Sequence, residues 1–128
     1  MPPRKSAAKS GCTKCSTVFN HRSAAPVLDS AAFYADCRRL LTAHGVMSVN
    51  LFGRSSSYAR SLARMGEAFG ARALWAFKPT REGNTVVLAE RAPTRPSREA
   101  LAARAEEIRQ RWGLPAPQWL KWLKPVEK

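Results

Sequence analysis

The strongest constraint on the fold is a periodic stretch in the middle of the chain, residues 54–70. Its large apolar residues, Tyr58, Leu62, Met65 and Phe69, recur at the three- and four-residue spacing that places side chains on one side of a helix. The serines just before Tyr58 carry hydroxyl groups that can cap the first backbone N–H groups. The pattern predicts an amphipathic helix that packs its apolar stripe against a core.

The opposite side of this predicted helix is cationic. Arg60 and Arg64 lie one turn apart, and Arg54 stands at the helix entrance, where free N–H groups also favour anions. The whole chain carries 22 Lys and Arg against 9 Asp and Glu, a net charge of +13. Such a balance favours a polyanionic partner, with nucleic acid as the first choice.

Capping residues and glycine stops predict two further helices, from Ser30 to about His44 and from Ser97 to Gly113. Strands are predicted where apolar and polar residues alternate, over residues 46–52, 73–78 and 85–91. Gly83 and Asn84 indicate a hairpin between the last two strands. The sequence therefore predicts a single α+β domain over residues 29–113, with a small three-stranded sheet and about three helices.

A winged helix-turn-helix is the close alternative. In that architecture residues 33–44 form the first helix, residues 56–69 the recognition helix, and the 73–91 hairpin the wing. The short stretch between Gly45 and Ser55 leaves little chain for the additional helix that this arrangement requires. The general α+β sheet is therefore preferred.

Residues 1–28 combine basic residues with Ser, Ala and Pro and contain no acidic residue. This composition predicts a flexible arm that orders on contact with phosphates, since it cannot bury enough apolar surface to fold alone. Its cations are Arg4, Lys5, Lys9 and Lys14, followed by Arg22. A solubilising tail is one alternative and a mitochondrial import sequence another, although Pro2 and Pro3 disfavour the latter.

Within the arm, Cys12 and Cys15 form a Cys-x-x-Cys pair, and His21 follows. Two cysteines at this spacing commonly make half of a zinc site. The fourth ligand would have to be Cys37 or His44, for which packing on the first helix is the simpler explanation. No cofactor is therefore expected, and zinc and a redox pair are the alternatives.

Residues 114–128 form a tail rich in Trp and Lys. In a brief helical turn, Trp119 and Trp122 face one way and Lys121 and Lys124 another. The tryptophans can cover the edge of the core, dock a partner protein or stack on unpaired bases.

These features predict a small, non-enzymatic, nucleic-acid-binding protein with a regulatory or accessory role, and DNA is preferred over RNA. Its expected contacts are Arg54, Arg60, Arg64, the hairpin tip at Lys78 and Arg81, and the basic arm. No nucleophile-elbow or phosphate-loop glycine motif is present, so a metal-dependent nuclease is the remaining enzymatic alternative. The alternatives from other classes are an interaction or inhibitor module that docks through its tryptophan tail, and an RNA- or ribosome-associated factor.

The odd number of cysteines and the absence of a secretory signal or a long apolar run predict a cytoplasmic location, on the nucleoid if the partner is DNA.

Overall fold

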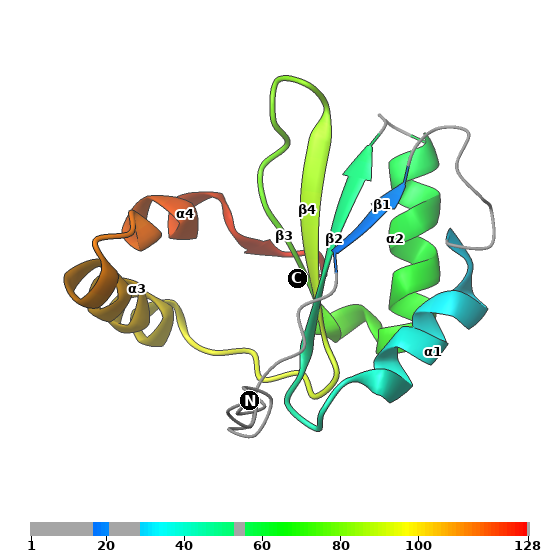
Figure 1. Cartoon of the computed structure of the whole chain (residues 1–128), viewed down its shortest axis with the longest axis horizontal. Coiled ribbons are helices and arrows are strands. Elements are labelled where there is room, and N and C mark those ends of the chain that lie inside the picture. Colours follow the sequence, from blue (N-terminus) through cyan, green and yellow to red (C-terminus); the bar gives the residue numbers. More distant parts are fainter. Residues whose placement is uncertain (1–16, 21–28, 53–55, 128) are drawn as a thin grey trace, which may run out of the picture.

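The computed structural model describes residues 17–20, 29–52 and 56–127. These residues form an α+β fold with four α-helices and a five-stranded sheet (Figure 1). The strands stand in the spatial order β1 (Thr17–Asn20), β2 (Val46–Phe52), β4 (Asn84–Glu90), β3 (Leu74–Ala76) and β5 (Lys124–Pro125). The predicted α+β class is confirmed, and β1 and β5 extend the predicted sheet at its two edges.

The sheet joins a parallel pair to an antiparallel group. β2 and β4 pair antiparallel from Val46 opposite Glu90 to Phe52 opposite Asn84. β1 runs parallel to β2, with Thr17 opposite Ser48. Parallel neighbours need a crossover connection, and α1 (Ala31–Leu40) lies in the connection between them. The first half of the fold is therefore a β-α-β unit.

β1 lies inside the stretch that composition assigns to a flexible arm. The expectation does not hold for residues 17–20, because they form backbone pairs with β2. A short strand is stabilised by its pairing with a neighbouring strand, and the local composition does not reveal that pairing. The rest of residues 1–28 lies outside the described residues.

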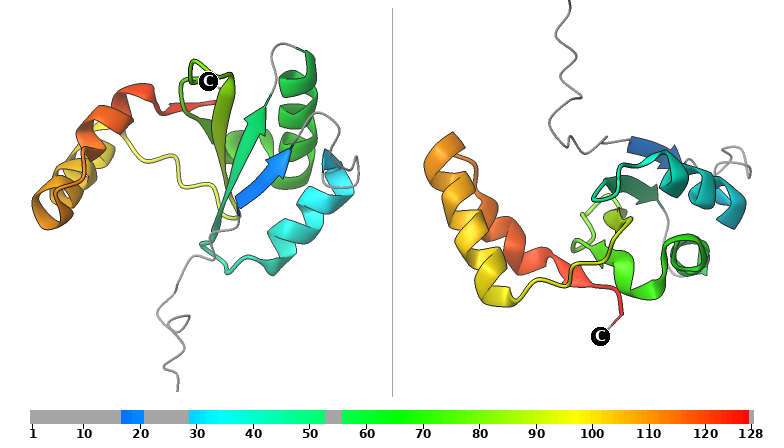
Figure 2. Two further views of the ribbon diagram at one scale, coloured as in Figure 1. Left: turned by 45° about the horizontal axis from the view of Figure 1, so that its top comes forward. Right: turned by 90° about the horizontal axis from the view of Figure 1, so that it is seen from below.

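Helices α1 and α2 (Ser56–Phe69) cover one face of the sheet (Figure 2). Met65 and Phe69 are buried, and Tyr58 and Leu62 pack against the same core, which confirms the apolar stripe predicted for this helix. The sheet residues in this core alternate along their strands and include Met47, Val49, Leu51, Val87 and Ala89.

Helix α1 ends earlier than the sequence predicts. Leu41 is already extended, and the Gly45 amide donates to the Thr42 carbonyl at 2.9 Å in a tight turn. A Cβ atom on Gly45 would lie 2.9 Å from Leu41 Cβ, so this turn needs glycine. Leu40, the last residue of α1, is 78% exposed.

The winged-helix alternative does not hold. It requires a helix between Gly45 and Ser55, and residues 46–52 of this stretch form β2 in the middle of the sheet. Alternation of Met47, Val49 and Leu51 with polar residues suits a strand, and their side chains are buried.

Helices α3 (Arg98–Trp112) and α4 (Ala116–Trp122) form a helical hairpin on the other side of the sheet from α1 and α2 (Figure 2). The two helices pack against each other, and β5 then returns to pair with β3. The predicted tail, residues 114–128, thus contributes a helix and an edge strand to the fold.

Gly113 ends α3 in the left-handed conformation, with φ of 68°, and its N–H donates to the Arg109 carbonyl at 2.8 Å. No atom lies within 4 Å of the position that a Cβ would take, so replacement by alanine tests backbone conformation alone. We expect Gly113→Ala to lower the free energy of unfolding by about 1 kcal/mol in urea denaturation.

Gly66 provides the matched control for that substitution. It lies inside α2, and a Cβ there would meet Leu74 Cδ1 at an ordinary 3.8 Å. Gly66→Ala should therefore leave stability unchanged or raise it by up to about 1 kcal/mol. Equal effects of the two substitutions would contradict the conformational explanation.

Candidate functional site

In the structure, the two arginines predicted for the cationic side of α2 have different surroundings. Arg60 is exposed, whereas Arg64 Nη1 donates to Asp29 Oδ2 at 2.7 Å. The side chains of Arg64 and Asp29 are 42% and 14% exposed. Arg64 therefore holds a largely buried carboxylate and joins α2 to the start of α1, while Arg60 stays exposed on the surface. Arg54 lies outside the described residues.

The Asp29 carboxylate accepts two further hydrogen bonds. The Tyr34 hydroxyl donates to Oδ1 at 2.8 Å, and the Ser61 hydroxyl donates to Oδ2 at 2.9 Å. Burial and the adjacent Asp29 carboxylate together raise the pKa of Tyr34 well above its ordinary value, so this phenol stays a donor. The four residues form a structural link between α1 and α2, which we call the Asp29 cluster.

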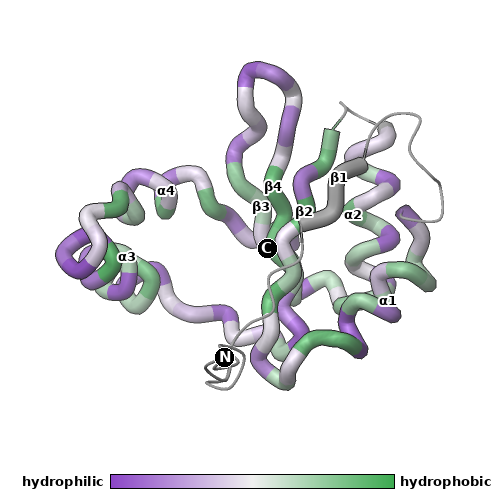
Figure 3. The backbone as a smooth tube through the Cα atoms, viewed as in Figure 1, coloured by the Kyte–Doolittle hydropathy of each residue, from purple (hydrophilic) through white to green (hydrophobic). Residues whose placement is uncertain are grey.

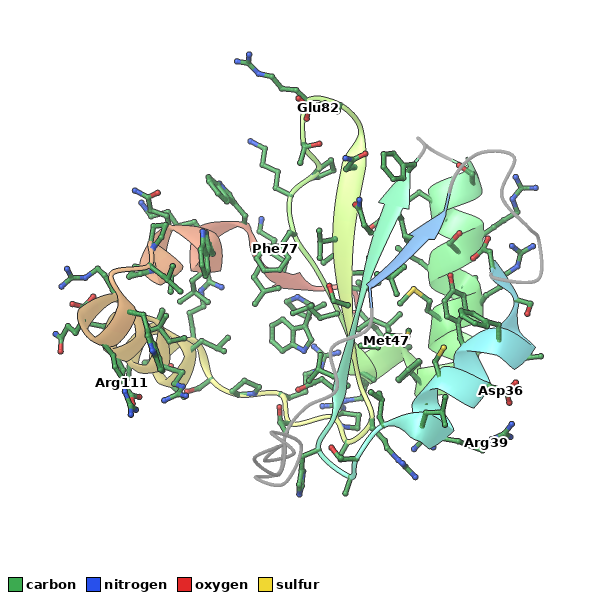
Figure 4. The ribbon with its side chains drawn as sticks, viewed as in Figure 1. Asp36, Arg39, Met47, Phe77, Glu82 and Arg111 are labelled. Atoms are coloured by element: carbon green, nitrogen blue, oxygen red, sulfur yellow. The ribbon has the colours of Figure 1, made fainter. Side chains whose placement is uncertain are left out.

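The structure brings two separately predicted groups of residues together. The hairpin, α4 and β5 surround a cavity of about 310 Å³, and the Lys78 amide donates to the Trp122 carbonyl at 3.0 Å. We call this the lysine–aromatic groove, and its main lining residues are Phe77, Lys78, Pro79, Lys121, Trp122 and Lys124. Phe77 lies on the side of the hairpin that faces α4 (Figure 4).

Three ammonium groups and two aromatic rings therefore share one opening, and no acidic side chain lines it. An arrangement of this kind suits an anion with a flat or apolar body, since the lysines attract the charge and the rings supply contact area. Lys121, Trp122 and Lys124 belonged to the predicted tail site, and Lys78 to the predicted hairpin site.

Arg81 stands apart from this groove, at the exposed tip of the hairpin. Its neighbour Glu82 projects from the same tip (Figure 4). Hydrogen bonds from the backbone and from Thr80 hold the pKa of Glu82 below its ordinary value, so the carboxylate is anionic beside Arg81. The tip therefore carries a mixed charge rather than a concentrated positive one.

The tryptophans of the α3–α4 hairpin remain accessible. Trp112 is 54% exposed, Trp119 39% and Trp122 48%. Hydrophobic positions accordingly appear along both helices among hydrophilic ones (Figure 3). Trp119 and Trp122 are thus partly exposed, and their three predicted roles stay predictions.

A second cavity, of about 150 Å³, lies where α3 meets the sheet. Its walls are mostly apolar and include Trp75, Leu88 and Leu101. Glu90 supplies a carboxylate, but its oxygens already accept from Trp75 Nε1 at 3.1 Å and from the Thr94 hydroxyl at 2.8 Å. This cavity is therefore mostly apolar, and both oxygens of the Glu90 carboxylate in its wall already accept hydrogen bonds.

The sheet face opposite α1 and α2 carries two unusual polar atoms. The side-chain oxygens of Asn50 and Asn84 are buried and accept no hydrogen bond from the described residues. Asn50 lies opposite Val86 and Asn84 opposite Phe52, so the two amides are diagonal neighbours on this face. Buried acceptors without donors are uncommon in folded proteins.

Several predicted site residues lie outside the described residues: Arg4, Lys5, Lys9, Lys14, Cys12, Cys15 and His21. The zinc alternative thus stays a prediction. Within the described parts of the chain, no three His, Cys, Asp or Glu side chains gather as a metal site, and no helix is long and apolar enough to cross a membrane. Cys37 packs against the core, where burial raises the pKa of its thiol.

Two features of these surfaces were missed from the sequence. Phe77 was expected only as a strand residue, and Asn50 only as a polar position in alternation. The contact of residue 78 with residue 122 depends on the pairing of β3 with β5, and no local sequence pattern predicts that pairing. Lys and Trp clustering in the tail was the sole available signal.

Comparison with known proteins gives one significant match. The polyamine aminopropyltransferase of Chromobacterium violaceum is 30% identical over 102 residues, which span 79% of this chain and 39% of that protein. The chain thus matches about two fifths of its relative's length. No family model and no solved structure matches significantly.

Proposed function

We propose that this chain forms part of an aminopropyltransferase-like α/β unit whose site is completed by residues outside the matched stretch. The sequence match to an aminopropyltransferase supports the relationship. The observation that carries the proposal is the β-α-β unit: β1 and β2 are parallel, and α1 lies in the connection between them. Parallel strands joined through a helix are the building unit of α/β sheets.

The charge of the chain indicates where a polyamine would bind. The relative's name specifies a polyamine, which is a polycation, whereas this chain has a net charge of +13 and its lysine–aromatic groove carries three lysines. Like charges in one groove disfavour a polyamine there. The carboxylates that would hold a polyamine are therefore expected outside the matched stretch.

Co-expression tests this proposal. The full chain would be produced together with the residues of the Chromobacterium violaceum protein that lie outside the matched stretch. We expect the two to purify as a one-to-one complex and to transfer aminopropyl groups to a polyamine only when combined. The intact relative serves as the positive control. Separate elution of the two products, with no transfer on mixing, would count against the proposal.

A second candidate function, nucleic-acid binding, is favoured by the lysine–aromatic groove. Lys78, Lys121 and Lys124 can contact phosphates, and Phe77 and Trp122 offer rings on which unpaired bases stack. Arg60 and Arg81 extend the cationic surface outside the groove. DNA remains the preferred polymer on the sequence argument, and the rings favour single strands over duplexes.

We expect the double substitution Lys121→Glu and Lys124→Glu to weaken binding of single-stranded DNA about tenfold or more at low salt, because it reverses two of the three groove cations. Fluorescence anisotropy gives the affinity. Arg39→Glu with Arg104→Glu is the matched control, since these exposed residues make the same charge change away from the groove. Equal weakening by both pairs would mean that net charge, and not this groove, determines binding.

A further inference from the structure

The lysine–aromatic groove collects cations of one kind. The described parts of the chain contain three lysines, Lys78, Lys121 and Lys124, and all three line this groove, whereas no arginine does. Every ion pair between described residues is made by an arginine. The three ammonium groups therefore remain available to an anion that enters the groove.

The register of β3 and β5 places two of these lysines on one face of the sheet. Lys124 is paired with Ala76, and the hydrogen bond from the Lys78 amide to the Trp122 carbonyl continues this pairing beyond the two strands. Side chains two residues apart on a strand share a face, so Lys78 and Lys124 are diagonal neighbours. The Cβ atoms of such neighbours lie within about 8 Å, so two lysine side chains can reach the same small anion. Ala76, between them, adds only a methyl group to the floor of the groove.

The size of the groove suits one small ligand or the end of a chain. Its volume of about 310 Å³ lies at the lower end of the range for ligand sites, which runs from roughly 300 to 1,000 Å³. Trp122 lines the same groove and is 48% exposed, so its ring is accessible. An accessible indole ring stacks on a flat group such as a nucleobase.

The three ammonium groups match a terminal phosphate better than one inside a strand. A phosphate monoester carries a charge of about −1.5 to −2 at neutral pH and three terminal oxygens, whereas each phosphate inside a strand carries a single charge. Lysine is a compact charge on a flexible stem, so each of the three lysines can meet a different oxygen. No acidic side chain lines the groove to oppose this charge.

We propose that the lysine–aromatic groove binds a terminal phosphate monoester joined to a nucleobase, with the phosphate at the three lysines and the base on the Trp122 ring. Two sources share this chemistry: the 5′-phosphorylated end of a nucleic-acid strand and a free nucleoside monophosphate. The inference rests on the second candidate function, nucleic-acid binding, for the strand end. It goes further by naming the part of the nucleic acid that this groove recognises.

Two single-stranded DNA oligonucleotides of about six nucleotides, identical except for a 5′-phosphate and labelled at the 3′ end, test the inference. We expect the full chain to bind the phosphorylated strand at least about fivefold more tightly at low salt, as measured by fluorescence anisotropy, because only that strand carries the monoester. Lys78→Gln with Lys124→Gln should remove this preference. Both side chains are exposed and the backbone pairing is retained, so the midpoint of thermal unfolding should stay the same.

Arg60→Gln with Arg81→Gln is the matched control, since it removes the same charge from exposed residues outside the groove. This pair should weaken both strands and leave their ratio of affinities unchanged.

Titration calorimetry with adenosine monophosphate and with ribose 5-phosphate, which lacks a base, tests the part played by the ring. We expect adenosine monophosphate to bind at least about fivefold more tightly, and Trp122→Leu to remove the difference. Adenosine monophosphate that binds at least as tightly as the phosphorylated strand identifies the free nucleotide as the ligand. Tighter binding of the strand identifies the strand end.

The remaining outcomes separate this inference from the second candidate function. Equal binding of the two strands overturns the inference, while nucleic-acid binding stands. If neither strand binds, nucleic-acid binding fails and the free nucleotide decides: binding of adenosine monophosphate that Lys78→Gln with Lys124→Gln weakens supports the inference, and its absence overturns it. Equal affinities for adenosine monophosphate and ribose 5-phosphate would show an anion site without a base contact, which also overturns it.

Discussion

Replacing Asp29 with alanine is expected to lower the free energy of unfolding by about 2–4 kcal/mol, because three donors lose their acceptor at once. The Tyr34 hydroxyl, the Ser61 hydroxyl and the Arg64 guanidinium all donate to this one carboxylate. Tyr34 is fully buried and Ser61 is 3% exposed, so water does not readily replace the lost partner. Chemical denaturation followed by tryptophan fluorescence measures the change.

The matched control is Asp36→Ala in α1. Asp36 pairs with Arg39, but both side chains are largely exposed, so the expected loss is about 0.5 kcal/mol or less. Combining Asp29→Ala with Arg64→Met should cost less than the sum of the two single changes, because they break the same contact. A loss below about 1 kcal/mol for Asp29→Ala would show that the cluster is not a main support of the α1–α2 pair.

Met65→Ala is expected to cost about 2–4 kcal/mol, since it removes a fully buried side chain and leaves a cavity. Met65 is 0% exposed and belongs to the core between α2 and the sheet. Neighbours such as Val49 and Val87 lie on strands whose positions are fixed by pairing, so the space can close only in part. The midpoint of urea unfolding should fall with an unchanged slope.

Glu67→Ala, an exposed change on the same helix, controls for helix propensity and should shift stability by less than about 0.5 kcal/mol. A similar loss from both substitutions would place the effect in the helix itself and not in the core.

The part of the fold that sequence could predict is the part set by local periodicity. The stripe from Tyr58 to Phe69 and the alternation in residues 46–52 each determine which side of an element is buried, and the core follows from them. β1 and β5 were missed because short edge strands depend on a neighbour far away in the sequence. The early end of α1 depends on the tight Thr42–Gly45 turn, whose crowding against Leu41 is a three-dimensional property.

The candidate site was predictable as a list of cations and rings but not as an arrangement. Lys78 and Trp122 meet because β3 pairs with β5, and Arg64 is paired because Asp29 lies just before α1, which packs beside α2. Neither long-range contact has a local signal. Outward-facing arginine at helical spacing indicates charge at the surface, and the structure adds which of those charges already has a partner.

The route of the chain through α3 and α4 has a mechanical consequence. The segment leaves the sheet after β4 and returns as β5, and at its return the amides of Lys78 and Val126 donate to the carbonyls of Trp122 and Leu74, each at 3.0 Å. Near its departure, Arg95 donates to the carbonyls of Arg72 and Glu127. Because both ends of the α3–α4 segment are hydrogen-bonded to the rest of the fold, the two helices can tilt relative to the sheet without separating from it. The exchange rates of the Lys78 and Val126 amide protons therefore report this tilt, because exchange requires their hydrogen bonds to open. Exchange should be faster when a ligand pushes the helices away from the sheet and slower when it holds them in place.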